Sequence, residues 1–184
     1  MRYLKSKLIT RLFVLLAVAT FAAQSARANE SDREPELPLP LCQSIQVEAG
    51  NEVAFHAYAL GVQVYRWDGN AWAFVGPVAN LYADAGFHGK VGTHYGGPTW
   101  ESKSGSKVIG RRVVNTGCTP DANSIPWLLL EAVSTEGPGV FDGVTFIQRV
   151  NTTGGTAPAA PGSFVGEEAR VPYTTEYYFY RAAN

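Results

Sequence analysis

The sequence predicts an all-β fold, a single-domain antiparallel sandwich or barrel with long loops, and three observations lead there. Short stretches with strand character follow one another along most of the chain, and no long amphipathic segment of helical period interrupts them. The chain contains 19 Gly and 11 Pro, the residues that most often end strands and form turns. Its 184 residues, 46% of them hydrophobic, suffice for one core and are too few for two ordinary domains.

The first 28 residues have the pattern of a secretory signal peptide. Four basic residues stand among the first eleven, an apolar run covers residues 12–23, and Ala26-Arg27-Ala28 is a small-residue cleavage site. The apolar run is much shorter than the roughly 20 residues that a membrane-spanning helix needs, so we expect no stable membrane insertion. The sequence therefore predicts an exported protein, either periplasmic or extracellular.

Charge argues against two classes of partner. Five of the 15 basic residues lie in the predicted signal peptide, and the remaining ten basic and 16 acidic residues give a net charge of −6. Nucleic acids and anionic membranes attract clustered Lys and Arg, and the only basic pair here is Arg111-Arg112. We therefore expect no nucleic-acid partner.

The predicted domain begins after an acidic, proline-rich arm at residues 29–40, and it covers residues 41–184. Its two cysteines, Cys42 and Cys118, are expected to form a disulfide because an exported protein meets an oxidising compartment. Catalytic or metal-binding thiols are the alternative, but neither cysteine has a Cys or His at ligand spacing.

In the first half of the domain, strands are expected at residues 44–49, 52–60, 62–67, 71–75 and 78–83. Asp68-Gly69-Asn70 separates two of them and has the composition of a hairpin turn, because Asp and Gly tolerate positive φ. The other breaks are placed mainly at glycine and proline.

The middle of the chain, residues 92–110, concentrates polar, aromatic and turn-forming residues. It reads as two successive hairpins, with strands at residues 90–95, 99–102 and 107–114 separated by Gly96-Gly97-Pro98 and by a turn at residues 103–106. Because side chains alternate along a strand, His94 faces opposite to Tyr95, and Trp100 faces opposite to Glu101.

Three further strands are expected at residues 125–134, 143–150 and 173–180, although the first of these could be a short helix. The segment 152–166 is the longest loop, and long loops in small domains are often functional. Both faces of the stretch 173–180 carry aromatic side chains, so one face is expected to line a cavity or meet a second packed layer.

Several of these segments carry a resemblance to a known family. They are GVQVYRW at 61–67, GTHYGGPTWE at 92–101, SKVIGRRV at 106–113, IPWLLLEAVS at 125–134, VTFIQRVNTTGG at 144–155 and VPYTTEYYFY at 171–180. With them the chain resembles an uncharacterised secreted family, the domain of unknown function DUF 3455, over nearly all of the sequence after the signal peptide. The resemblance implies export and a single domain, and it supplies no activity.

His94 and Glu101 are the candidate catalytic residues, as a base and its orienting carboxylate. If the turn between them is tight they can sit close together, and we predict one connected site that reaches a solvent-accessible pocket. The alternative is a polar network that merely pins the two hairpins. A metal site that adds His56 and His88 is disfavoured, and we expect no metal and no cofactor.

Tyr95, Trp100 and Arg112 are the candidate ligand-binding residues, because aromatic rings stack on sugars and on small apolar molecules. The alternative is that the aromatic residues simply fill the core. Two functions remain: an exported module that binds a small molecule or a carbohydrate, and a hydrolase-type enzyme that uses His94 and Glu101. The first is favoured because no recognisable nucleophile or carboxylate pair is present. The ligand and the oligomeric state stay open.

Overall fold

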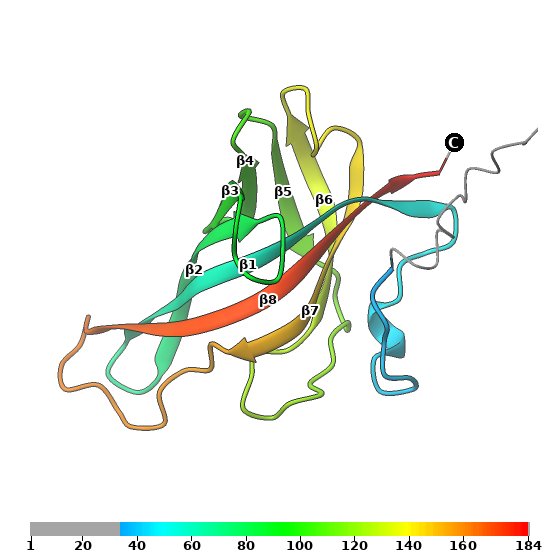
Figure 1. The fold of residues 1–184 in the computed structure, drawn as a ribbon. Helices are drawn as coiled ribbons and strands as arrows, with labels where there is room; N and C mark the ends of the chain where they lie inside the picture. Colours follow the sequence, from blue (N-terminus) through cyan, green and yellow to red (C-terminus); the bar gives the residue numbers. More distant parts are fainter. Residues whose placement is uncertain (1–33, 184) are drawn as a thin grey trace, which may run out of the picture.

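The computed structural model describes residues 34–183, in which eight antiparallel strands close into one barrel (Figure 1). Each strand pairs with the next, and β8 pairs with β1. The strands are β1 Asn51–Trp67, β2 Trp72–Tyr82, β3 Lys90–Tyr95, β4 Thr99–Ser102, β5 Lys107–Arg112, β6 Leu128–Glu136, β7 Val144–Gly154 and β8 Glu168–Ala182. The predicted all-β antiparallel fold is confirmed, and of the two architectures left open it is the barrel. The expected signal peptide lies outside the described residues.

The barrel closes along its two longest strands. β1 and β8 pair from Asn51 opposite Ala182 to Arg66 opposite Glu168, and Figure 1 shows them running side by side as long curved ribbons. This pairing joins opposite ends of the domain, so each strand has a hydrogen-bonded neighbour on both sides and the sheet closes on itself.

Two predicted breaks within strands are wrong. The strands expected at 52–60 and 62–67 are one strand, β1, and those expected at 71–75 and 78–83 are one strand, β2. Gly61 does not end a strand but lets two strands approach closely. A Cβ atom built on Gly61 would stand 2.3 Å from the carbonyl oxygen of Val78, on the paired strand β2.

The strand expected at 44–49 is also wrong, because the structure has a short 3-10 turn, η2, at Gln43–Ile45 followed by a loop. The segment at 125–134, which left strand and helix open, contains the start of strand β6. Two predictions hold residue for residue, β3 at Lys90–Tyr95 and β4 at Thr99–Ser102. The Asp68 turn also holds, since its Oδ1 accepts hydrogen bonds from the backbone of Asn70 and Ala71, both at 2.7 Å.

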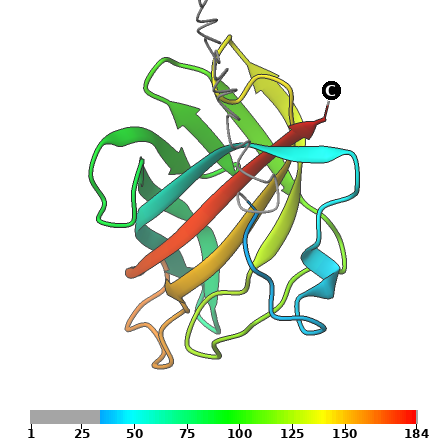
Figure 2. The same ribbon diagram turned by 45° about the vertical axis from the view of Figure 1, so that its right-hand side comes forward.

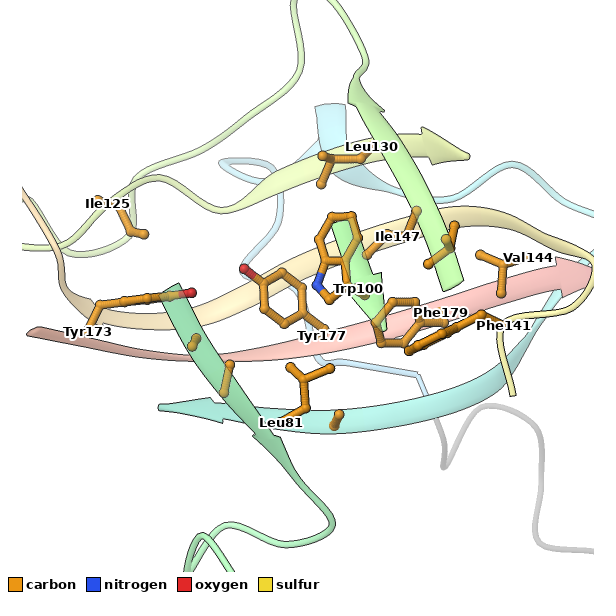
Figure 3. Close-up of a cluster of buried hydrophobic side chains, with 14 residues drawn as sticks. Leu81, Trp100, Ile125, Leu130, Phe141, Val144, Ile147, Tyr173, Tyr177 and Phe179 are labelled. Carbon is orange, nitrogen blue, oxygen red and sulfur yellow. The ribbon is translucent and has the colours of Figure 1, made fainter. Parts of the chain in front are cut away.

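The main core fills the barrel. Its buried side chains include Trp100, Phe141, Ile147, Tyr177 and Phe179 (Figure 3). At one end Phe141, from the β6–β7 loop, packs on Phe179 with ring centroids 4.7 Å apart and on Phe55 at 5.8 Å. This aromatic group closes that end of the barrel.

A second core lies outside the barrel wall. The segment before β1 packs over β6, β7 and β8, where it buries Ile45 together with Trp127, Tyr178 and Tyr180. Strand β8 is therefore buried on both faces, with Tyr177 and Phe179 inside and Tyr178 and Tyr180 outside, as the aromatic pattern predicted.

The second core is fastened by the disulfide between Cys42 and Cys118 (S–S 2.06 Å). The bond joins the η2 segment to the β5–β6 loop, and Figure 2 shows these two segments side by side. The described part of the predicted arm, residues 34–40, precedes this anchor. Its Leu37 packs against the second core, and the Pro38 carbonyl accepts a hydrogen bond from the Cys42 backbone at 3.1 Å.

Candidate functional site

A cavity of about 380 Å³ lies inside the end of the barrel opposite the aromatic closure. The β1–β2, β3–β4, β5–β6 and β7–β8 connections meet at this end. Every strand contributes at least one lining side chain: Gln63 and Tyr65, Phe74 and Pro77, His94, Trp100, Arg112, Leu128 and Leu130, Arg149, and Tyr177, with Pro98, Ile125 and Pro126 from the connections. The cavity is thus a property of the closed barrel and of no single hairpin.

The β5–β6 connection is held across the mouth of the cavity. Ser124 forms an isolated bridge with Gly155, the Ile125 backbone donates to the Gly154 carbonyl at 2.9 Å, and the Tyr65 hydroxyl donates to the Gly155 carbonyl at 2.6 Å. These bonds fix the position of Ile125 and Pro126 at the rim. The β5–β6 connection, residues 113–127, is therefore a structured part of the site.

His94 and Trp100 face each other inside the barrel because the β3–β4 register pairs them. Their rings stack with centroids 4.3 Å apart and planes 10° apart, and the Tyr177 ring meets the edge of both. The His94 Nδ1–H donates to the Thr99 carbonyl at 2.8 Å. The pKa of His94 is lowered to about 3. Burial is the main cause and the nearby Arg149 charge acts in the same direction, whereas the hydrogen bond to Thr99 acts against them. The imidazole is therefore neutral near pH 7, with its Nε2 as the acceptor.

The predicted partnership of His94 with Glu101 is wrong. The same register pairs Glu101 with Thr93, so Glu101 lies on the outer face of the sheet while His94 lies inside. There its carboxylate accepts a hydrogen bond from the Tyr95 hydroxyl at 2.8 Å and lies 3.9 Å from the Lys107 ammonium. The connection at residues 96–98 gives paired residues of this hairpin an even sequence separation, so the odd separation of His94 and Glu101 places them on opposite faces.

Of the three candidate ligand-binding residues, Trp100 and Arg112 line the cavity and Tyr95 lies outside with Glu101. Arg112 pairs with Leu130 and so faces inward at the rim, whereas Arg111 faces outward and pairs with Glu131 at 2.7 Å. The sequence did not single out Gln63 or Arg149, and it placed Tyr177 only within the stretch 173–180, one face of which was expected to line a cavity or meet a second packed layer. No signal marks Arg149, because its neighbours at a spacing of two, Thr145, Ile147 and Asn151, make a mixed polar and apolar strand face.

The cavity wall contains buried polar groups that the described residues leave without a hydrogen-bond partner. They are the Gln63 Nε2, the Trp100 Nε1 and, just beside them, the hydroxyls of Tyr173 and Tyr177. Figure 3 shows the two hydroxyls turned toward each other. An unpaired buried polar group costs roughly 1–3 kcal/mol, so the wall offers these groups to any molecule that occupies the cavity, water included.

Arg149 brings a positive charge into the same space. It faces inward because the β7–β8 register pairs it with Tyr177. Its Nε and Nη2 donate to the Pro126 carbonyl at 3.1 and 2.6 Å, and Arg112 donates to the Thr116 carbonyl at 2.7 Å. Within the part of the chain that the structure describes, neither arginine forms an ion pair, and no lining residue is acidic.

The other two histidines lie outside the cavity. His56 stacks on Tyr178 and lies 2.9 Å from the Glu176 carboxylate, and His88 lies 3.1 Å from Asp84 on the β2–β3 connection. Among residues 34–183 no group of three His, Cys, Asp or Glu side chains could hold a metal ion. No helix in that range is long and apolar enough to cross a membrane.

The fold and this site define a class: an up-and-down, eight-stranded antiparallel barrel with a ligand-sized cavity that opens to solvent at one end. More particularly, the chain belongs to the family described as "Protein of unknown function (DUF3455)", whose model matches residues 48–181. The match covers the whole cavity lining, strands β1 to β7 in full and β8 except for its last residue. Neither the curated proteins nor the solved structures include a match to this chain.

Proposed function

We propose that this protein is an exported binding module that holds a small molecule inside the barrel. One observation carries the proposal: the cavity exists in a closed barrel whose wall presents several buried polar groups without partners. A bound molecule that hydrogen-bonds to these groups removes their desolvation cost, which gives the site a reason to be polar at these positions only.

The dimensions of the cavity favour a small molecule over a carbohydrate chain. About 380 Å³ lies near the lower end of the range of roughly 300–1,000 Å³ typical of ligand sites. Most of the lining side chains are apolar, and one face of Trp100 is already covered by His94. Trp100 is also buried, so it offers no open aromatic platform on which a sugar ring could stack.

We do not propose a hydrolase, because the pair of residues on which that function depended lies on two faces of the sheet. The cavity lining among the described residues contains no Ser, Thr or Cys that could act as a nucleophile. His94 could still accept a proton, but its second nitrogen is engaged by Thr99 and no carboxylate orients it.

Export is the other part of the proposal. The signal-like segment at residues 1–28 predicts it, and the disulfide between Cys42 and Cys118 supports it because such bonds persist in oxidising compartments. The proposed site needs no metal and no nucleic acid.

Native mass spectrometry of protein produced from the full chain tests the proposal. We expect a co-purified small molecule, or binding of one from a chemically diverse panel, and loss of binding in Leu128→Trp, which fills the cavity rim. The matched control is Val133→Trp, which adds the same ring to an exposed position of the same strand. Absence of any bound species, or equal binding by both variants, contradicts the proposal.

A further inference from the structure

We infer that the ligand is a small organic monocarboxylate with an apolar body, and that Arg149 holds its carboxylate. This inference rests on the proposed function, since it assigns a chemical class to the occupant of the same cavity. Charge, the balance of hydrogen-bond donors and the apolar part of the lining each support it.

Charge gives the first argument. Arg149 and Arg112 are the only charged residues that line the cavity, and neither has a carboxylate partner within residues 34–183. Arg149 is partly buried, and the groups that its guanidinium meets, the Pro126 carbonyl and the Tyr177 hydroxyl, are both neutral. A guanidinium in a partly dry site is stabilised most by an anion, and its planar fork of N–H groups matches a carboxylate. A neutral or cationic ligand would leave this charge uncompensated.

The donors give the second argument. The unpaired Trp100 Nε1 and Gln63 Nε2 can only donate hydrogen bonds. Burial raises the pKa of Tyr173 and of Tyr177, so both hydroxyls keep their protons and can donate as well. Together with the arginines, these groups supply an excess of donors. Carboxylate oxygens accept several hydrogen bonds and donate none, so a carboxylate complements this wall better than an alcohol or an amine.

Arg149 and Tyr177 are neighbours in the barrel. They stand opposite each other in the β7–β8 register, and the arginine charge lowers the Tyr177 pKa against the larger upward effect of burial. The same charge acts in this way on Tyr65 and Tyr173. The positive end of the cavity is therefore the part bounded by Arg149 and these tyrosines, and the carboxylate belongs there.

The rest of the lining specifies the body of the ligand. Phe74 on β2, Ile125 in the β5–β6 connection, and Leu128 and Leu130 on β6 present hydrocarbon surface to the cavity. An apolar body gains roughly 25 cal/mol for each Å² of surface that it buries, whereas a second polar group would meet no partner there. The cavity therefore favours one polar end and one apolar end.

Three probes with the same body separate the charges. They are 4-phenylbutyrate, 4-phenylbutan-1-ol and 4-phenylbutylamine, titrated calorimetrically into the full-chain protein after any co-purified ligand has been removed with an apolar resin. We expect the carboxylate to bind about tenfold or more tightly than the alcohol, because charge-assisted hydrogen bonds are stronger than neutral ones. The amine is expected to bind more weakly than either.

Variants locate the effect. Arg149→Gln is expected to reduce the preference for the carboxylate over the alcohol to about threefold or less while the alcohol still binds. Arg111→Gln is the matched control. It removes an arginine that lies on the outer face of the barrel beside Glu131, and it is expected to keep the full preference for the carboxylate. Arg112→Gln, at the exposed rim, is expected to lose part of the preference, and it tests the charge argument should Arg149→Gln fail to fold.

The outcomes distinguish the two proposals. Equal binding of the three probes, or tighter binding of the amine, overturns the monocarboxylate inference and leaves the binding module standing. Binding of none of them, with no adduct in native mass spectrometry, overturns both. A carboxylate preference that survives in both Arg149→Gln and Arg112→Gln shows that the anion lies elsewhere and contradicts the assignment to Arg149.

Discussion

At the β3–β4 hairpin, alternation of side chains decides which groups meet. His94, Trp100 and Glu101 lie within eight residues of sequence, yet only the first two share a space. The aromatic pair belongs to the cavity wall, whereas Glu101 belongs to an exterior network with Tyr95 and Lys107. This division has measurable consequences for both residues.

Glu101→Ala is expected to leave ligand binding unchanged and to lower the free energy of unfolding by about 1 kcal/mol or less. The reason is that the carboxylate interacts with Tyr95 and Lys107 on the outer surface, where its side chain is 35% exposed and water screens the charges. Denaturant unfolding and calorimetric titration of the same preparation measure the two quantities. A variant that folds normally but no longer binds would refute the placement of Glu101 outside the site.

His94 is expected to make stability depend on pH. Its pKa is about 3 in the folded protein and 6.5 ordinarily, so between these values the unfolded chain binds a proton that the folded protein does not. Stability is therefore fully present above about pH 6.5 and declines as the pH falls below it, by up to roughly 1.4 kcal/mol per pH unit.

Urea unfolding at several pH values between about 7 and 5 measures this slope, above the range where most carboxylates titrate. His94→Gln, which keeps a donor for the Thr99 carbonyl, is expected to flatten the curve. Parallel curves for the parent and His94→Gln would count against the depressed pKa.

At the scale of the strands, glycine has two different uses in this barrel. Gly61 lies in the middle of β1, where the β2 backbone approaches too closely for any side chain. Gly96 lies in the β3–β4 turn and has open space around the position of a Cβ. The first use is invisible in the sequence, because a lone glycine between two apolar stretches resembles a strand boundary.

Gly61→Ala and Gly96→Ala form a matched pair that tests this distinction. In the first, the added methyl group must displace backbone that lies 2.3 Å away, so we expect a loss of about 2 kcal/mol or more in unfolding free energy. In the second, no atom lies within 4 Å, so the change is expected to stay within about 0.5 kcal/mol. Equal melting temperatures for the two variants would disprove the close approach of β1 and β2.

At the scale of the whole molecule, the protein has two cores on either side of one sheet. The inner core and its cavity lie within the barrel, and the outer core depends on a segment that precedes β1 and is held by the disulfide. The bond also restrains the β5–β6 connection, which supplies Ile125 and Pro126 to the cavity rim. The disulfide at Cys118 therefore links two features: the attachment of the segment before β1 and the shape of the cavity mouth.

Replacing Cys42 and Cys118 by Ser is expected to lower the free energy of unfolding by roughly 2–4 kcal/mol, because the cross-link closes a long loop in the unfolded chain. Equilibrium unfolding of the double variant measures the loss. Thiol titration of the denatured, unreduced parent protein is expected to find no reactive thiol at these positions, and two reactive thiols would contradict the disulfide.

The sequence by itself determined what depends on neighbours along the chain. Apolar residues in short alternating runs predicted the all-β fold, and turn residues placed β3 and β4 at their observed bounds. The two cysteines, in a chain that begins with a signal-like segment, predicted the disulfide. The aromatic residues on both faces of residues 173–180 predicted that one face lines a cavity or meets a second packed layer. Each of these inferences rests on periodicity or composition, which a local stretch already contains.

Only the tertiary structure decided how the strands close and what the closure encloses. Barrel and sandwich share the same alternation, and they differ in whether β1 pairs with β8, residues more than a hundred positions apart. That pairing brings Gln63, Arg149 and Tyr177 to one cavity, although nothing near them in sequence relates them. The β3–β4 register, which is likewise fixed by hydrogen bonds between strands, places Glu101 and His94 on opposite faces although they are close in sequence.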